Sequence, residues 1–86
     1  MPEICRFYGI IIRMFYEDHN PPHFHALYGD DEAWININTL AVFHGILPSR
    51  ALGMVIEWAS MHQDELRQNW ELMGEQQKPK KISPLK

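Results

Sequence analysis

The hydrophobic pattern of this chain changes its period once, at Pro48. Before Pro48, short apolar segments rich in aromatic and β-branched residues alternate with turns, which is typical of strands. After it, apolar residues recur at three- and four-residue steps, which indicates an amphipathic helix that ends near Gly74. The pattern therefore predicts an α+β fold. We expect an antiparallel sheet of four or five strands over residues 3–45, with one long helix over residues 48–73 packed on one face.

Turn residues divide the strand region further. The paired prolines within residues 17–22 remove backbone donors, so the chain must reverse or kink there. Residues 23–28 and 32–37 are strand candidates joined by a Gly-Asp-Asp connection, which predicts a hairpin. Residues 4–16 are predicted to form either one bent strand or a tight hairpin.

The length of 86 residues allows one domain, which we assign to residues 1–76. No apolar run approaches the ~18 residues that a membrane-spanning helix needs, and the first residues do not have the pattern of an export signal. A single cysteine, Cys5, agrees with a reducing compartment. A cytoplasmic location without membrane contact is therefore expected.

Charge is distributed unevenly along the chain. Residues 1–76 contain 4 basic and 11 acidic residues, a net charge of −7, whereas residues 77–86 contain four lysines and no acid. An acidic body argues against broad binding of nucleic-acid backbones, because most of that affinity comes from Lys and Arg. The basic tail is predicted to be either disordered or an extended arm across the sheet.

Three of the five histidines lie within seven residues of one another. His23 and His25 are two apart on a predicted strand, so both rings project from the same face, and the proline-rich turn can fold His19 back toward them. Three neutral imidazoles at one point suit Zn²⁺ or another divalent transition metal, with Asp18 as a further ligand or as an acceptor that orients a ring. The alternative is that these histidines are hydrogen-bonded loop and sheet residues without a metal.

The same histidines also suit acid–base catalysis of RNA strand cleavage without a metal. Arg13 or Arg6 would then stabilise the developing phosphate charge, although an arginine on the outer face of a strand needs no special explanation. The catalytic candidates are therefore His19, His23, His25 and Arg13. The sequence leaves open whether the protein is an enzyme.

Several short segments together resemble a known family. They are Arg6-Phe7-Tyr8-Gly9-Ile10, Asp18-His19-Asn20-Pro21-Pro22-His23-Phe24-His25, Leu47-Pro48, Arg50-Ala51-Leu52, Glu57-Trp58-Ala59 and Asn69-Trp70. The chain resembles, over nearly its whole length, a small uncharacterised bacterial family known as domain of unknown function 4160, and departs from it mainly at Trp34 and His44. The resemblance assigns no activity. It implies that such proteins are often encoded beside another small protein, in pairs that look like toxin–antitoxin modules.

Our leading hypothesis is a small protein that acts through a partner, either a cognate protein encoded nearby or a second copy of itself. The uncovered face or edge of the predicted sheet invites such a partner, and the acidic body suits the masking of a basic one. The alternative hypothesis is a metal-dependent hydrolase or an RNA-cleaving enzyme with a site at His19, His23 and His25. A sequence-specific DNA-binding protein is disfavoured, since no helix presents basic residues along one face. The sequence leaves open a toxin or antitoxin role, the substrate, the metal and the oligomeric state.

Overall fold

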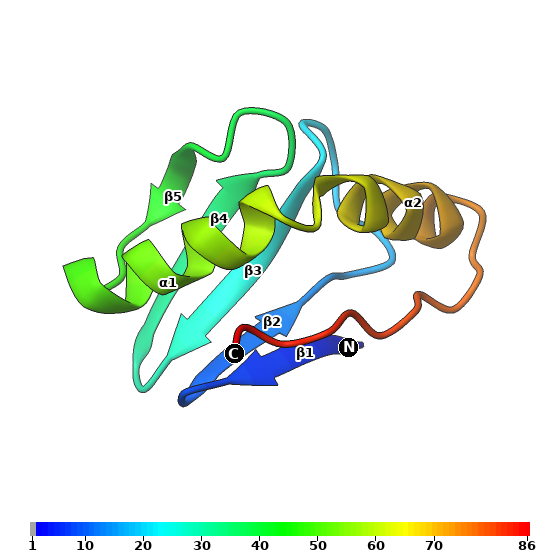
Figure 1. The fold of residues 1–86 in the computed structure, drawn as a ribbon. Helices are drawn as coiled ribbons and strands as arrows, with labels where there is room; N and C mark the ends of the chain where they lie inside the picture. The colour runs from blue at the N-terminus through cyan, green and yellow to red at the C-terminus, as the bar shows by residue number, and fades with distance from the viewer. Residues whose placement is uncertain (1) are drawn as a thin grey trace.

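The computed structural model describes residues 2–86 and consists of a five-stranded sheet and two helices (Figure 1). The strands lie side by side in chain order, and each neighbouring pair is antiparallel. They are β1 (Glu3–Phe7), β2 (Ile10–Arg13), β3 (His23–Tyr28), β4 (Asp31–Asn36) and β5 (Val42–Gly45), and the helices are α1 (Ser49–Ser60) and α2 (Gln63–Gly74). The predicted α+β class and antiparallel sheet are confirmed.

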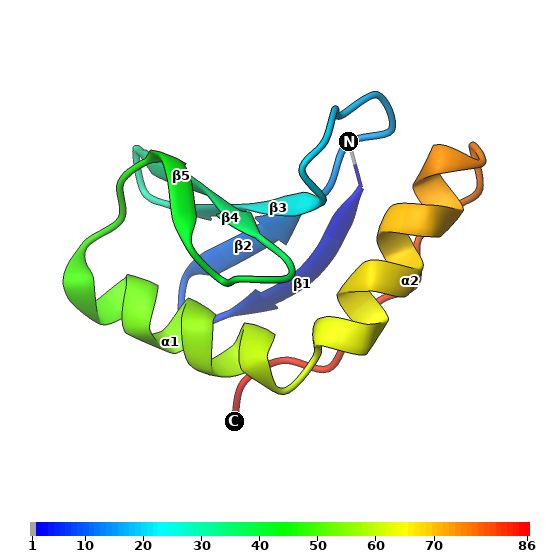
Figure 2. The same cartoon turned by 90° about the horizontal axis from the view of Figure 1, so that it is seen from above.

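The prediction of one long helix over residues 48–73 is wrong, because the chain breaks at Met61 and His62. Their N–H groups donate to the carbonyls of Trp58 and Ala59, three residues back, which tightens and ends the last turn of α1. A straight helix of that length would span about 39 Å, whereas the longest extent of the molecule is 34 Å. The break turns α2 away from the direction of α1, so that both helices follow the curved sheet (Figure 2).

The β1–β2 connection is a tight hairpin, which decides between the two alternatives for residues 4–16. Tyr8 and Gly9 form the turn between the paired residues Phe7 and Ile10. Both turn residues have positive φ angles, 48° and 81°, as expected of a two-residue hairpin loop whose twist matches that of the strands. Glycine at the second position adopts such an angle without steric cost.

The hydrophobic core lies between α1 and one face of the sheet. Trp58 of α1 is fully buried, and its ring centroid lies 5.6 Å from that of Phe7 and 5.9 Å from that of Phe24. Because side chains alternate along a strand, the neighbours of Phe24 in β3, His23 and His25, project from the opposite face. That second face carries a row of paired residues across β2 to β5, namely Arg13, His25, Trp34 and His44.

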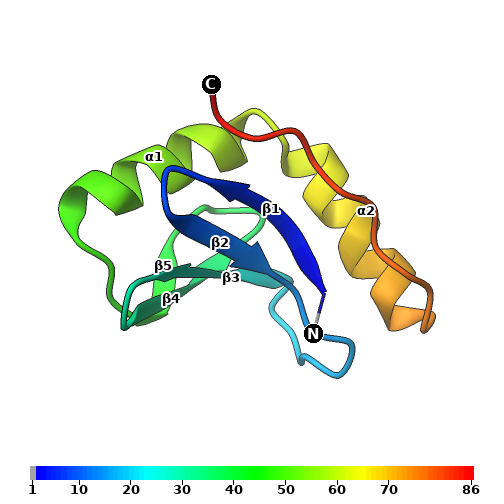
Figure 3. The same cartoon turned by 90° about the horizontal axis from the view of Figure 1, so that it is seen from below.

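The last nine residues lie extended beside β1 and α2 (Figure 3). The N–H of Ile82 donates to the carbonyl of Ile4 at 3.1 Å, and the Ile82 side chain is buried. The indole N–H of Trp58 donates to the carbonyl of Ser83 at 2.7 Å. This segment therefore covers the β1 edge of the sheet, while no other strand of residues 2–86 pairs with the β5 edge. No helix within residues 2–86 has the length and apolar character needed to cross a membrane.

Asn69 connects α2 to this C-terminal segment, and we expect its replacement to destabilise the fold. Its buried amide donates to the Lys80 carbonyl and accepts the Lys80 N–H, both at 2.8 Å. Asn69→Ala leaves both groups without a partner, so the free energy of unfolding should fall by about 2–3 kcal/mol in urea denaturation. Gln68→Ala, at an exposed position of the same helix, should change it by less than about 0.5 kcal/mol. Equal losses in the two variants would contradict this role.

Candidate functional site

Two imidazole rings and one carboxylate converge at the start of β3. His23 and His25 project from the face opposite α1, and the loop between β2 and β3 brings Asp18 back over them. The Asp18 Oδ2 atom lies 3.3 Å from His23 Nε2 and 3.0 Å from His25 Nε2. One potential ligand atom from each residue lies within 4.8 Å of the other two. We refer to these residues as the Asp18–His23–His25 cluster.

The backbone determines which nitrogen of a neutral His23 ring carries the proton. Its Nδ1 lies 2.7 Å from the carbonyl oxygen of Pro21, which can only accept, so Nδ1 carries the proton and donates. In the neutral ring, Nε2 is then a lone-pair acceptor. This atom is buried and has no hydrogen-bond partner among residues 2–86, and it faces the Asp18 carboxylate, which also offers lone pairs. Facing acceptors of this kind need a cation between them, either a second ring proton or a metal ion.

His25 is held between two carboxylates. Its Nδ1 lies 2.9 Å from Glu32 Oε2, and its Nε2 points to Asp18 in the cluster. Glu32 Oε2 also accepts the indole N–H of Trp34 at 3.0 Å. The hydrogen bond from His25, more than that from Trp34, lowers the pKa of Glu32 and outweighs the opposing effect of burial. Glu32 therefore stays ionised and orients His25, as carboxylates commonly do for metal-binding histidines.

Aromatic rings enclose the two histidines. Trp34 stacks nearly parallel to His23 with an interplanar angle of 19°, and Phe15 meets the His25 ring edge-on at a centroid distance of 4.3 Å. The enclosing rings are those of Phe15, Trp34, Phe43 and Trp70. They keep water from both imidazoles, whose side chains are only 4% and 5% exposed, and restrict their rotation.

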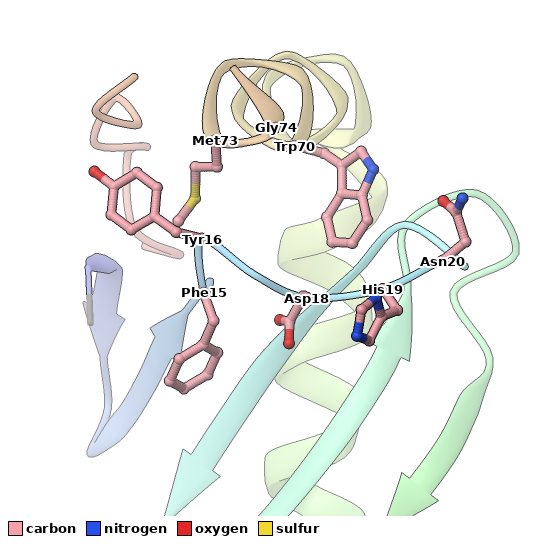
Figure 4. Close-up of a pocket in the computed structure, with 8 residues that line it drawn as sticks. All are labelled: Phe15, Tyr16, Asp18, His19, Asn20, Trp70, Met73 and Gly74. Carbon is pink, nitrogen blue, oxygen red and sulfur yellow. The ribbon is translucent and has the colours of Figure 1, made fainter. Parts of the chain in front are cut away.

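A pocket of about 260 Å³ lies over Asp18, between the β2–β3 loop and α2. The side chains of Trp70 and Met73 extend from α2 toward the loop that contains Asp18 and His19 (Figure 4). The lining residues are Phe15, Tyr16, Asp18, His19, Asn20, Trp70, Met73 and Gly74. Of the three cluster residues, Asp18 alone lines the pocket, so the cluster is reached from solvent at its carboxylate.

A family model described as a domain of unknown function (DUF4160) matches residues 9–71. The chain belongs to this family. The matched region of the DUF4160 chain includes the whole cluster, Glu32 and Trp70. A search of curated proteins and a search of solved structures gave no significant match. The chemistry of the DUF4160 cluster must therefore be inferred from its geometry.

The DUF4160 fold brings together three of the residues that we selected from the sequence. Asp18, His23 and His25 form the cluster, whereas His19 is exposed and lines the pocket beside it. Arg13 is paired with His25 across β2 and β3, so it lies on the same face of the sheet. It forms no ion pair with any residue of the described chain.

Glu32, Trp34 and Trp70 are site residues that the sequence analysis did not select. A signal for Trp34 was available, because a hairpin of residues 23–28 and 32–37 can pair it with His25, as the structure does. Glu32 lies two residues from Trp34 and hence on the same face of β4. Trp70 carries no such local signal, since it reaches the site from α2.

Proposed function

We propose that this protein binds one divalent transition-metal ion at the Asp18–His23–His25 cluster and acts as a metal-dependent hydrolase. The observation that carries the proposal is the buried, unpartnered Nε2 of His23, which faces the Asp18 carboxylate. Two imidazole nitrogens and one carboxylate form the ligand set of several catalytic zinc sites, in which the fourth position holds water or substrate. A metal ion in such a site lowers the pKa of its bound water and polarises a substrate carbonyl or phosphoryl oxygen.

The residues around the cluster support this proposal because they prepare both rings to bind through Nε2. The Pro21 carbonyl orients His23 from behind, and Glu32 orients His25 in the same way. Such partners fix the tautomer and raise the basicity of the ligating nitrogen. The pocket beside Asp18 offers a substrate access to the open coordination position.

Metal content of the untagged protein tests the proposal. After dialysis against micromolar zinc, we expect about one equivalent in the native chain and none in the His23→Ala, His25→Ala double variant. His44→Ala removes an exposed histidine of the same face and should keep the metal. Circular dichroism shows whether the double variant folds, and Asp18→Asn serves as a second loss-of-ligand variant. A folded native chain that binds no zinc, cobalt, iron or manganese would overturn the proposal.

Replacement of Glu32 should weaken metal binding without removing a ligand. Glu32→Gln takes away the negative charge that holds His25, so the zinc dissociation constant should rise about 10- to 100-fold. Competition with a chromophoric chelator measures this change. Asp31→Asn, at an exposed position next to it in β4, should leave the constant unchanged. The same affinity in Glu32→Gln and the native chain would show that Glu32 does not support the ligand.

A second candidate function is the binding of a protein partner at β5. This edge strand is exposed along its whole length, and Phe43 and the following Ile46 are 44% and 74% exposed. Residues 40–49 contain no Lys, Arg, Asp or Glu, although charged residues commonly protect sheet edges from other chains. Exposed apolar residues at an unprotected edge favour association. This observation supports a protein partner at β5. That the partner is a cognate protein encoded nearby, in a toxin–antitoxin-like pair, is a hypothesis that comes from the family resemblance.

Co-purification with the product of the neighbouring gene tests this second candidate. Ile46→Glu should abolish co-elution, whereas Met61→Glu, at an apolar residue 58% exposed outside β5, should preserve it. Loss of a native dimer in Ile46→Glu would instead identify a second copy as the partner. A native chain that elutes as a monomer, alone and after co-expression, would exclude both.

A further inference from the structure

We infer that the substrate is an uncharged carboxylic ester or amide with an aromatic or apolar group next to the scissile bond, rather than a phosphodiester such as RNA. This inference rests on the proposed hydrolase function and names its substrate class. It is carried by the composition of the pocket beside Asp18 and by the charges of the segments that form it.

Aromatic and apolar side chains supply half of the pocket's eight lining residues, although polar atoms make up more of its exposed surface. Phe15, Tyr16, Trp70 and Met73 surround the space, and its polar side chains are those of Asp18, His19 and Asn20. Trp70 is partly exposed and offers a ring on which an aromatic group of a ligand can stack. A volume of about 260 Å³ lies just below the range of about 300–1,000 Å³ that is usual for small-molecule sites, so the pocket holds a small ligand or one group of a larger one.

The pocket and its borders carry negative charge. None of the lining residues is a lysine or an arginine, and Asp18 is the one with a full charge. The exposed Glu17 precedes Asp18 in the same loop, and the exposed Glu71 and Glu75 flank Trp70 and Met73 on the α2 side. Arg67, the only basic residue of α2, is engaged by Asp64 and Asn38. A phosphodiester would meet repulsion here, since sites for phosphoryl groups supply Arg, Lys or several metal ions.

The charge of the ligand set points to the same class. A divalent ion bound by two neutral imidazoles and the Asp18 carboxylate keeps a net charge of about +1. That charge suffices to polarise a neutral carbonyl and to stabilise the single negative charge that develops on its oxygen. Water then adds to the carbonyl carbon, the bond to the leaving oxygen or nitrogen breaks, and the water supplies the proton that the leaving group takes up.

Two chromogenic substrates with the same leaving group test this inference. With zinc-loaded protein, we expect hydrolysis of p-nitrophenyl benzoate with a kcat/KM at least about tenfold above that of Asp18→Asn assayed at the same total zinc concentration. Bis(p-nitrophenyl) phosphate should react no faster than with free zinc. Trp70→Ala should raise the KM for the benzoate about tenfold, because a stacking contact is lost. Since the Trp70 ring also packs against His23, the zinc content of the variant is measured and the KM values are compared at equal zinc loading. Gln68→Ala, exposed on the same helix, is the matched control.

The outcomes separate this inference from the proposed function. Zinc-dependent cleavage of the phosphodiester in preference to the benzoate would overturn the substrate class and leave the hydrolase in place. Zinc binding without turnover of either compound would overturn both the hydrolase and its substrate class. An unchanged KM in Trp70→Ala would show that the substrate does not stack on Trp70.

Discussion

Zinc at a hundredfold excess over its dissociation constant will raise the free energy of unfolding of the native chain by about 2.7 kcal/mol. For a domain of this length the midpoint of thermal unfolding should rise on the order of 10 °C. The physical reason is that the three ligands meet only in the folded state, since Asp18 reaches His23 and His25 through the loop between β2 and β3. Differential scanning calorimetry with and without zinc measures the shift.

Asp18→Asn should change the metal-free and metal-bound proteins in different ways. Its amide can donate to the unpartnered Nε2 of His23, which offsets the loss of the Asp18 carboxylate beside His25, so the metal-free variant should stay close to the native chain in stability. Zinc should then add little, because the anionic ligand is gone. His44→Ala should retain the full shift. If zinc stabilised Asp18→Asn as much as the native chain, the cluster would not be the binding site.

Gly45→Ala should lower the free energy of unfolding by about 3 kcal/mol or more. A Cβ atom at this position would lie 2.1 Å from the Glu32 carbonyl oxygen and 3.2 Å from the Ala33 Cα atom, so the backbone of β4 or β5 would have to shift. The φ angle of 78° is strained for alanine as well. Chemical denaturation measures the loss, and any folded fraction should bind zinc more weakly, because the displaced residue is Glu32.

Gly53→Ala is the matched control for that substitution. Gly53 lies within α1, and a Cβ atom there would meet no atom within 4 Å. Alanine favours a helix interior over glycine by about 1 kcal/mol, so this variant should be as stable as the native chain or more so. A Gly45→Ala protein that matched it would contradict the close approach of β5 to β4.

The sheet could be predicted from the sequence because its signals are local. The Gly-Asp-Asp segment at residues 29–31 and the prolines of residues 17–22 predict the boundaries of β3, although the structure forms the turn with residues 29 and 30 alone and begins β4 at Asp31. The break at Met61 and His62 could not be predicted in the same way. Only two residues link the helices, and the apolar residues of α2 keep the three- and four-residue spacing of those in α1. The hydrophobic period therefore runs through the break and gives no sign of it.

The cluster was predictable where it depends on strand geometry and unpredictable where it depends on a loop. Residues two apart on a strand share a face, which placed His23 and His25 together. Asp18 and His19 are neighbours in the loop, and spacing alone does not show which of them turns inward. Trp70 reaches the site only after α2 has packed, a contact across more than forty residues that no local pattern encodes.

Phe43 belongs to both of the surfaces that we consider functional. One side of its ring meets the ring of His23 at a centroid distance of 5.2 Å, and 44% of the residue remains open to solvent on the β5 edge. A partner bound at the β5 edge would therefore contact Phe43, whose ring packs against His23, one of the proposed metal ligands. Any energetic coupling through this ring is reciprocal. If bound metal changes the affinity for the partner by a given factor, the bound partner changes the affinity for metal by the same factor.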